Sequence, residues 1–265
     1  MIYCFSGTGN TLYAAERLAL LLDTQCHVFT PEELREPENN VFESSDKIII
    51  WAFPTYSWGV PPVIRKVLRF SKFRFSPHAV HLGLTSCGDD VGNLAEMFHS
   101  DLKKRGVIAG AVFSVRMPNT YVMMKGFDTD SEELEKRKIK ELPSRLEEIA
   151  NKIKQRVYHK NDVVKGSFAC LKTRVIYPWF IRHAMSPKGF NVDGQICLHC
   201  GKCADACPMD NIVFNKERVP EWGDKCAFCT ACYQICPVHA INWKKATIGK
   251  GQWYFGKDKN GSIKK

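Results

Sequence analysis

Eight cysteines in the C-terminal part of the chain repeat one spacing twice. The first set reads C-L-H-C-G-K-C-A-D-A-C-P from Cys197, and the second reads C-A-F-C-T-A-C-Y-Q-I-C-P from Cys226. Both are C-x2-C-x2-C-x3-C-P, a spacing whose thiolates bind [4Fe–4S] cubes. Three closely spaced cysteines reach one cube, and the fourth, beside its proline, reaches the other. The spacing therefore predicts two clusters whose ligands cross between the two sets.

The expected ligands of one cluster are Cys197, Cys200, Cys203 and Cys236, and those of the second are Cys226, Cys229, Cys232 and Cys207. Structural zinc is the alternative interpretation, because paired C-x2-C also forms zinc sites. A structural zinc ion takes four ligands, so zinc alone does not require two copies of the C-x2-C-x2-C-x3-C-P spacing. The segment resembles bacterial two-cluster ferredoxins over about fifty residues, with the cluster-binding spacing intact.

A second candidate site lies at the start of the chain, where a short apolar strand leads into a glycine-hydroxyl loop and then a helix pattern. The loop consists of Ser6, Gly7, Thr8, Gly9, Asn10 and Thr11. Backbone N–H groups at a helix N-terminus, together with hydroxyls, bind phosphate. The dinucleotide motif G-x-G-x-x-G fails because Leu12 replaces its third glycine, and the P-loop lysine is absent. The loop resembles the phosphate loop of flavodoxins, which implies bound FMN; a purely structural turn is the alternative.

Two later loops follow apolar strands, at the sheet edge where flavodoxin-like folds bind their ligand. The resemblance implies flavin contacts from Pro54, Thr55, Tyr56, Ser57, Trp58 and Gly59, and from Ser86, Cys87, Gly88 and Asp89. Tyr56 and Trp58 are expected to pack on the flavin ring, since flat aromatic surfaces attract one another. Gly59 would let the backbone approach the ring. Two aromatic residues that merely cover a loop remain the alternative, and Cys87 is expected to be a neutral lining residue rather than a redox thiol.

Five apolar segments separated by helix patterns indicate a parallel sheet with right-handed crossovers. The predicted strands are 1–5, 26–29, 47–53, 79–86 and 107–115. The predicted helices are 12–22, 31–35, 62–70, 91–105 and 131–159, the last with Pro143 inside it. The sequence thus predicts an α/β flavodoxin-like doubly wound sheet of five parallel strands, followed by a small α+β two-cluster ferredoxin domain.

The expected domains are a flavodoxin-like FMN-binding domain (1–159), an apolar packed connector (160–190), a 2[4Fe–4S] ferredoxin domain (191–243) and a basic tail (244–265). The connector is too apolar for a flexible linker. Its large side chains are expected to be buried: Phe168, Val175, Ile176, Tyr177, Trp179, Phe180 and Ile181. Residues 119–127 form an insertion that would cap the flavin or face the ferredoxin domain. The tail aromatics, Trp253, Tyr254 and Phe255, are expected to dock back onto the protein.

The chain has 265 residues, 45% of them hydrophobic, and a formal net charge of +10. It contains no apolar run near the ~18 residues of a membrane helix and no basic leader, so we expect no transmembrane segment and a cytoplasmic location. In a reducing compartment twelve cysteines indicate metal rather than disulfides. The basic charge suits redox partner proteins with acidic surfaces. No nucleic-acid module is visible, and a homo-oligomer is left open.

The two halves together resemble the EFR1-type flavodoxin–ferredoxin fusion proteins of anaerobic bacteria and archaea. The resemblance implies FMN and two [4Fe–4S] clusters, and an electron-transfer protein that converts between one-electron and two-electron steps. The alternative is an FMN-dependent reductase that receives electrons through the clusters and reduces a small molecule at the flavin. No nicotinamide fingerprint is present. No catalytic residue is assigned, and Tyr121 and Asp89 are the only proton donors nominated for the reductase.

Overall fold

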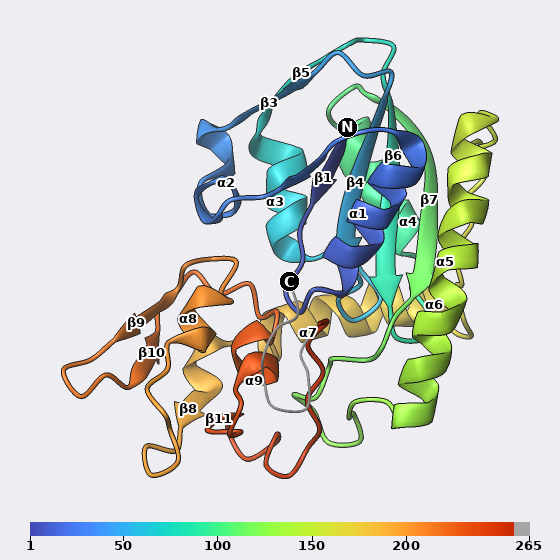
Figure 1. Ribbon diagram of the computed structural model, residues 1–265. Helices are drawn as coiled ribbons and strands as arrows, with labels where there is room; N and C mark the ends of the chain where they lie inside the picture. The colour runs from blue at the N-terminus through green and yellow to red at the C-terminus, as the bar shows by residue number, and fades with distance from the viewer. Residues whose placement is uncertain (257–265) are drawn as a thin grey trace.

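A five-stranded parallel sheet forms the centre of the N-terminal half in this computed structural model, which describes residues 1–256. The strand order is β2-β1-β4-β6-β7, visible in Figure 1. The strands are β1 (Ile2–Cys4), β2 (Cys26–Val28), β4 (Ile48–Pro54), β6 (Val80–Cys87) and β7 (Ile108–Arg116). Counted along the sheet alone, this is the order 2-1-3-4-5 of flavodoxin-like folds. The predicted fold class is confirmed.

Helices cover both faces of the sheet, because successive residues of a buried parallel strand point to opposite sides. Ile50 and Ala52 of β4 face α1 (Asn10–Leu22) and α5 (Glu132–Lys154). Trp51 and Phe53 face the other layer. That layer contains α3 (Pro62–Phe70) and α4 (Leu94–Lys103), and α2 (Pro31–Arg35) packs beside it.

Three local features differ from the sequence prediction. Helix α5 ends at Lys154 instead of near His159, because Arg156 adopts a left-handed backbone conformation with φ 58°. Helix α4 is shorter than the expected 91–105. A separate two-stranded parallel pair, β3 (Val41–Ser44) with β5 (Lys72–Phe75), was not predicted. Both of its strands are short and half exposed, so they lack the continuous apolar run of a central strand.

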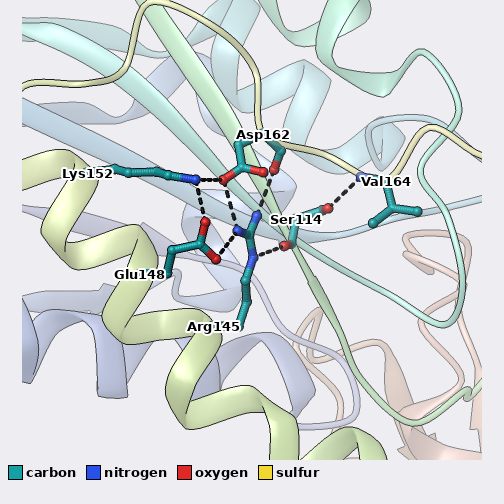
Figure 2. A network of polar contacts seen from close by, with 6 residues as sticks. All are labelled: Ser114, Arg145, Glu148, Lys152, Asp162 and Val164. Carbon is teal, nitrogen blue, oxygen red and sulfur yellow. Dashed lines mark hydrogen bonds and ion pairs between the residues drawn. The ribbon is translucent and has the colours of Figure 1, made fainter.

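Residues 158–164, expected in part to open the connector, extend the sheet region alongside β7. Figure 2 shows the polar network that holds them. The Arg145 guanidinium donates to the carboxylate of Asp162 at 2.9 Å and to its carbonyl at 2.9 Å. Lys152 donates to the same carboxylate at 2.7 Å, and the Val164 amide donates to the Ser114 hydroxyl at 3.0 Å. These bonds attach the segment to β7 and α5.

The connector helix, residues 169–183, runs beneath the carboxyl ends of the strands (Figure 1). It consists of α6 (Ala169–Leu171), one π-helical turn (Lys172–Ile176) and α7 (Tyr177–His183). One face is buried, at Thr173, Tyr177 and Phe180. The expectation that every large connector side chain is buried is wrong, since a helix lying between two domains and solvent can bury only one stripe. The exposed ones are Phe168 (78%), Val175 (57%) and Trp179 (50%).

The C-terminal half contains two small antiparallel pairs and two short helices. β8 (Phe190–Val192) pairs with β11 (Ile241–Trp243), and β9 (Ile212–Phe214) pairs with β10 (Pro220–Trp222). Helices α8 (Lys202–Asp205) and α9 (Ala231–Ile235) each follow one cysteine loop. Short single-turn helices cover residues Pro37–Asn39 and Pro187–Gly189. Within residues 1–256, no helix is both long and apolar enough to cross a membrane.

Residues 250–255, the C-terminal strap, lie across both halves. The Phe255 amide donates to the Thr8 carbonyl at 2.8 Å, and the Phe255 ring stacks on Tyr13 with centroids 4.3 Å apart. The Lys250 ammonium donates to the carbonyls of Val122 and Met124 in the insertion. The tail aromatics therefore dock as expected. Four of the lysines assigned to the basic tail lie outside the described residues: Lys257, Lys259, Lys264 and Lys265.

Candidate functional site

A cleft at the carboxyl edge of the sheet joins segments from the whole chain. It encloses about 700 Å³ of atom-free space, including the solvent at its mouth. The expected flavin-binding segments supply Ser6, Gly7, Thr8, Asn10, Thr11, Pro54, Thr55, Tyr56, Ser57, Ser86, Cys87 and Gly88. The insertion, which was expected to cap the flavin or to face the ferredoxin domain, supplies Asn119, Thr120 and Tyr121. Segments with no expected flavin contact supply Met117, Pro118, Phe180, Phe228, Cys229 and Thr230. The cleft is therefore shared by the sheet domain, the connector and the cysteine-rich domain.

The glycine-hydroxyl loop is built as an anion cradle. No side chain within the described chain caps the first turn of α1, so its backbone N–H groups are free to meet an anion. The Ser6 hydroxyl is buried and has no hydrogen-bond partner among residues 1–256. Thr11 shares a hydrogen bond of 2.7 Å with Ser86, which ties the first loop to the third. A phosphate group would satisfy the buried hydroxyl and the free amides, so these residues fit the monophosphate of FMN.

Asn10 and Gly9 stabilise the loop through contacts with other segments of the chain. The Asn10 amide donates to the Pro118 carbonyl at 2.8 Å, and its oxygen accepts from the Trp253 indole at 2.9 Å. Gly9 has φ 86°, a left-handed conformation that suits glycine, and Phe255 of the strap packs where a side chain would stand. The strap therefore closes the outer side of the phosphate loop.

The second loop is a tight turn that the connector helix clamps. Ser57 and Trp58 both have positive φ values, 43° and 63°, while Tyr56 and Gly59 exchange backbone hydrogen bonds at 2.9 Å. Non-glycine residues are strained in this conformation and need support from their surroundings. Thr173 supplies part of it by donating to the Trp58 carbonyl at 2.8 Å.

Gly59 faces the connector instead of the cleft. A side chain there would meet the ring of Tyr177, whose hydroxyl donates to the Val60 carbonyl at 2.6 Å. Trp58 and Asp89 line a second cavity beside the cleft, and Lys172 lies over the Trp58 ring at 5.0 Å. Gly59 thus allows the connector helix to approach, a role that the sequence did not indicate.

Cys87 is a buried thiol that donates weakly to the Val115 carbonyl at 3.7 Å. Burial raises its pKa to about 12, well above the ordinary thiol value. Because the thiolate is the reactive form, a thiol held neutral in this way is unreactive. The environment fits a neutral residue lining the cleft.

The cysteines gather in two groups that cross between the motifs. Cys197, Cys200 and Cys203 line a cavity of about 370 Å³ together with Cys236 of the second motif. Burial raises the pKa of Cys203 to about 11, and the neighbouring charges of Cys200 and Cys236 add to the rise. We call this the distal group.

The second group joins Cys226, Cys229 and Cys232 to Cys207 of the first motif. Burial raises the pKa of Cys226 to about 11, with a further rise from the neighbouring charge of Cys207. The pKa of Cys229 is raised by burial and then by the charges of Cys226 and Cys207. Backbone amides of Asn211 and Phe228 donate to the sulfurs of Cys207 and Cys226, at 3.4 and 3.3 Å. We call this the proximal group.

Both groups suit a cluster better than isolated thiols. A buried thiolate is unfavourable unless a cation compensates its charge, and iron supplies that charge. Among residues 1–256, no three His, Cys, Asp or Glu side chains meet closely enough to hold a single metal ion. His199 and His239 both have left-handed backbone conformations within the turns of the two motifs.

The proximal group lies directly against the cleft. Cys229 is one of the lining residues, and a side chain on Gly7 would lie only 2.6 Å from the Cys229 Cβ. Tyr56 also lines the cleft, and its buried hydroxyl has no hydrogen-bond partner among residues 1–256. Burial raises the pKa of Tyr56, and the next causes are the charges of Cys229 and Cys226. Tyr56 therefore lies between the cleft and the proximal cysteines.

Comparison with known proteins gives one domain assignment. Residues 190–237 match the 4Fe-4S dicluster domain. With the eight motif cysteines, this match implies two [4Fe–4S] clusters. It covers less than half of the chain, and no curated protein matches the sequence.

Several solved structures are similar to part of the chain. A flavodoxin from Streptococcus pneumonia TIGR4 has 17% identity and a TM-score of 0.30, over 57% of this chain and 95% of its own. The Trp repressor binding protein from Bacillus subtilis has 10% identity and a TM-score of 0.29, over 55% of this chain and 95% of its own.

The metal-soaked Flv1 flavodiiron core from Synechocystis sp. PCC6803 has 17% identity and a TM-score of 0.28 over 57% of this chain. The match spans only 35% of the flavodiiron core's own length. The flavodoxin-like fold is identified from the strand order of the sheet.

No pattern in the sequence indicated which residues of the connector and of the second cysteine loop would line the cleft, whereas the insertion 119–127 was expected to cap the flavin or to face the ferredoxin domain. Phe180 was expected to be buried, but nothing indicated against which surface. Phe228, Cys229 and Thr230 lie within a cluster motif, whose spacing reports on ligands and not on neighbours. Only contacts between domains bring these residues to the cleft.

Proposed function

We propose that this protein transfers electrons between two [4Fe–4S] clusters and an FMN bound in the cleft, as a member of the EFR1-type flavodoxin–ferredoxin fusions. The observation that carries the proposal is that Cys229, a predicted cluster ligand, lines the same cleft as the phosphate loop. Clusters exchange single electrons and a flavin holds one or two, so the pair would convert between one-electron carriers and a two-electron step.

The distal group would bind its cluster through Cys197, Cys200, Cys203 and Cys236, and the proximal group through Cys226, Cys229, Cys232 and Cys207. The phosphate loop would hold the FMN phosphate through its amides and hydroxyls. The loops after β4 and β6 would hold the ring, with Cys87 and Gly88 among the lining residues. Protein groups thus position the cofactors and tune their surroundings, while the cofactors supply the redox chemistry.

The two groups differ in access to solvent, which suggests the direction of exchange with partners. Cys200 is exposed, and so are the apolar side chains of Leu198 and Phe214, which line the same cavity. Lys216 and Arg218 are exposed on the turn between β9 and β10. We propose that a redox partner with an acidic surface exchanges electrons at the distal cluster, since opposite charges steer such encounters. We also propose a cytoplasmic location.

A rigid interface would keep the cofactors at fixed separations. Arg35 donates to the carbonyls of Met209 and Asp210, both at 3.3 Å, on the far side of the proximal group. Gln234 of α9 donates to the Thr120 carbonyl at 2.6 Å. These contacts, the connector helix and the strap join the two halves at several points, in contrast to a flexible tether.

The identity of the flavin tests the first part of the proposal. Heat-released cofactor should have the mass of FMN. Thr8→Val and Thr11→Val should each weaken FMN binding by losing a charge-assisted hydrogen bond, worth about 1.5–3 kcal/mol or roughly 10- to 150-fold in affinity. FAD in the released fraction, or unchanged affinity in both variants, would mean that the loop does not hold this cofactor.

The kinetics of flavin reduction test the relay. After the clusters are reduced by a low-potential one-electron donor, stopped-flow absorbance should show flavin reduction at a rate independent of protein concentration. A rate that rises in proportion to protein concentration would show transfer between molecules, and the relay within one chain would be wrong.

An FMN-dependent reductase is the second candidate. The observation in its favour is a second cavity that shares a wall with the cleft and contains both nominated donors, Tyr121 and Asp89.

A further inference from the structure

A second cavity lies beside the cleft and encloses about 1080 Å³ of atom-free space, counted to its open mouth. The two cavities share part of one wall, including Ser57, Gly88 and Tyr121. None of the phosphate-loop residues lines the second cavity. It is therefore a chamber that adjoins the cleft on the side away from the phosphate loop.

The walls found only in the second cavity are mostly apolar and come largely from segments outside the sheet. Met124 and Phe127 belong to the insertion, and Ile176 and Trp179 belong to the connector helix. Phe127 and Trp179 are 38% and 50% exposed. Large apolar side chains that stay exposed around a hollow are typical of small-molecule sites.

One polar side chain that lines both the cleft and this chamber lacks a partner. The Tyr121 hydroxyl is buried and has no hydrogen-bond partner among residues 1–256. Its ring is held edge-on by Phe127 and Phe180, with centroids 5.5 and 5.6 Å away. A buried hydroxyl without a partner is energetically unfavourable, because it has lost its hydrogen bonds to water. An acceptor atom on a ligand would remove that cost.

The charges around the chamber restrict the ligand further. The Asp90 carboxylate is paired with Lys172 at 2.7 Å, so that cation is already neutralised. Asp89 also lines the chamber and its side chain is 85% exposed. An anionic ligand would meet these carboxylates without a free cation among the lining residues, so a neutral ligand fits better.

We propose that the second cavity binds a neutral, flat, apolar molecule with one hydrogen-bond acceptor, and that Tyr121 donates to this acceptor. The binding follows from the cavity itself. Its use rests on the proposed function, because the shared wall would bring the ligand against the flavin. That position is the one a substrate of a flavin-dependent reductase must occupy.

Two matched probes test the proposal on protein loaded with flavin and clusters. One is 6-propionyl-2-dimethylaminonaphthalene, which carries a carbonyl acceptor, and the other is 2-dimethylaminonaphthalene, which lacks it. Equilibrium dialysis should show that Trp179→Ser weakens both probes about tenfold or more. Tyr121→Phe should weaken only the carbonyl probe, by about three- to tenfold, as expected for one hydrogen bond. Leu20→Ser, an exposed site on α1, should change neither.

Equal effects of Tyr121→Phe on both probes would show that the hydroxyl does not select the acceptor. Unchanged binding in Trp179→Ser, or no binding to flavin-loaded protein because the flavin itself fills the chamber, would overturn the proposal. Flavin and iron contents of each variant report whether it folds. Concentration-independent flavin reduction is measured in the same samples, so a failed relay with intact probe binding is distinguishable from a failed ligand site.

Discussion

The two halves of the doubled cysteine motif share one backbone conformation and differ in their surroundings. Equivalent positions adopt the same left-handed conformation in both halves: His199 and Phe228 (φ 50° and 55°), Gly201 and Thr230 (79° and 65°), and Asp210 and His239 (46° and 53°). The ligand spacing therefore determines the local turns in both cases. The side chains between the cysteines determine whether each motif contacts solvent or the rest of the protein.

The first motif, residues 197–207, faces solvent, and the second motif, residues 226–236, faces the rest of the protein. His199 is partly exposed and its ring contacts the Arg218 carbonyl at 3.0 Å, whereas Phe228 is buried against Phe180 and Trp243. Cluster potentials depend on solvent exposure and on hydrogen bonds to the sulfurs. Two similar motifs can thus support two roles, exchange with a partner and contact with the cleft.

The largest effect is expected when a cysteine that is predicted to bind the cluster of the other motif is removed. Cys236→Ala should destroy the distal cluster, and Cys207→Ala the proximal one, each with loss of about half of the iron. The two variants should retain different EPR signals from the surviving cluster. If Cys236→Ala instead removes the cluster of its sequence neighbours, Cys226, Cys229 and Cys232, the crossed assignment is wrong.

A second test separates the cleft from the proximal group. Gly7→Ala places a methyl group 2.6 Å from the Cys229 Cβ, and relief of such overpacking costs about 1–3 kcal/mol. We expect weaker flavin binding and slower internal flavin reduction. The control is Gly194→Ala, where a Cβ has no neighbour within 4 Å. If the two variants bind flavin equally well and reduce it at the same rate, the contact between Gly7 and Cys229 does not affect either property.

A third test uses the distal cluster as an internal reference. If the Tyr56 hydroxyl donates to a sulfur of the proximal cluster, Tyr56→Phe should lower that cluster's reduction potential, because such hydrogen bonds stabilise the reduced state. We expect a shift of less than tenfold in the one-electron equilibrium, that is, less than about 59 mV. An EPR-monitored redox titration measures both clusters at once. Shifts of equal size at the two clusters would contradict a local hydrogen bond.

The smallest expected effect comes from exchanging the residues at one equivalent position. Thr230 has φ 65°, which is strained for a β-branched residue. Its hydroxyl donates a long hydrogen bond of 3.5 Å to the Thr120 carbonyl. Thr230→Gly should stabilise the cluster-loaded protein by up to about 1 kcal/mol, and Gly201→Thr should destabilise it by about 1–2 kcal/mol. Urea unfolding midpoints measure both. A destabilising Thr230→Gly would mean that the side chain contributes more than its strain costs.

Much of the fold was predictable because its signals are local. The apolar run 48–53 and the spacing of glycines in 6–11 indicate a strand and a phosphate loop without reference to the rest of the chain. Pro62 and the apolar face of the next helix predicted α3 with its observed limits. The crossed grouping of cysteines also follows from spacing, since short loops bring ligands around one cluster.

The arrangement of the two domains depends on contacts that no local pattern encodes. The sequence assigns Gly7 to a phosphate loop. In the structure, the lack of a side chain at Gly7 leaves room for Cys229. The sequence assigns Gly59 to the flavin contacts. In the structure, the lack of a side chain at Gly59 leaves room for the Tyr177 ring. Phe168 and Val175 are as apolar as Tyr177, but the connector helix buries only the stripe that meets the loops above it. The sequence alone determined which cofactor-binding elements exist, because spacing and periodicity act over a few residues. Only the tertiary structure decided which cysteine group lies against the cleft, because packing joins residues more than two hundred positions apart, as in Gly7 and Cys229.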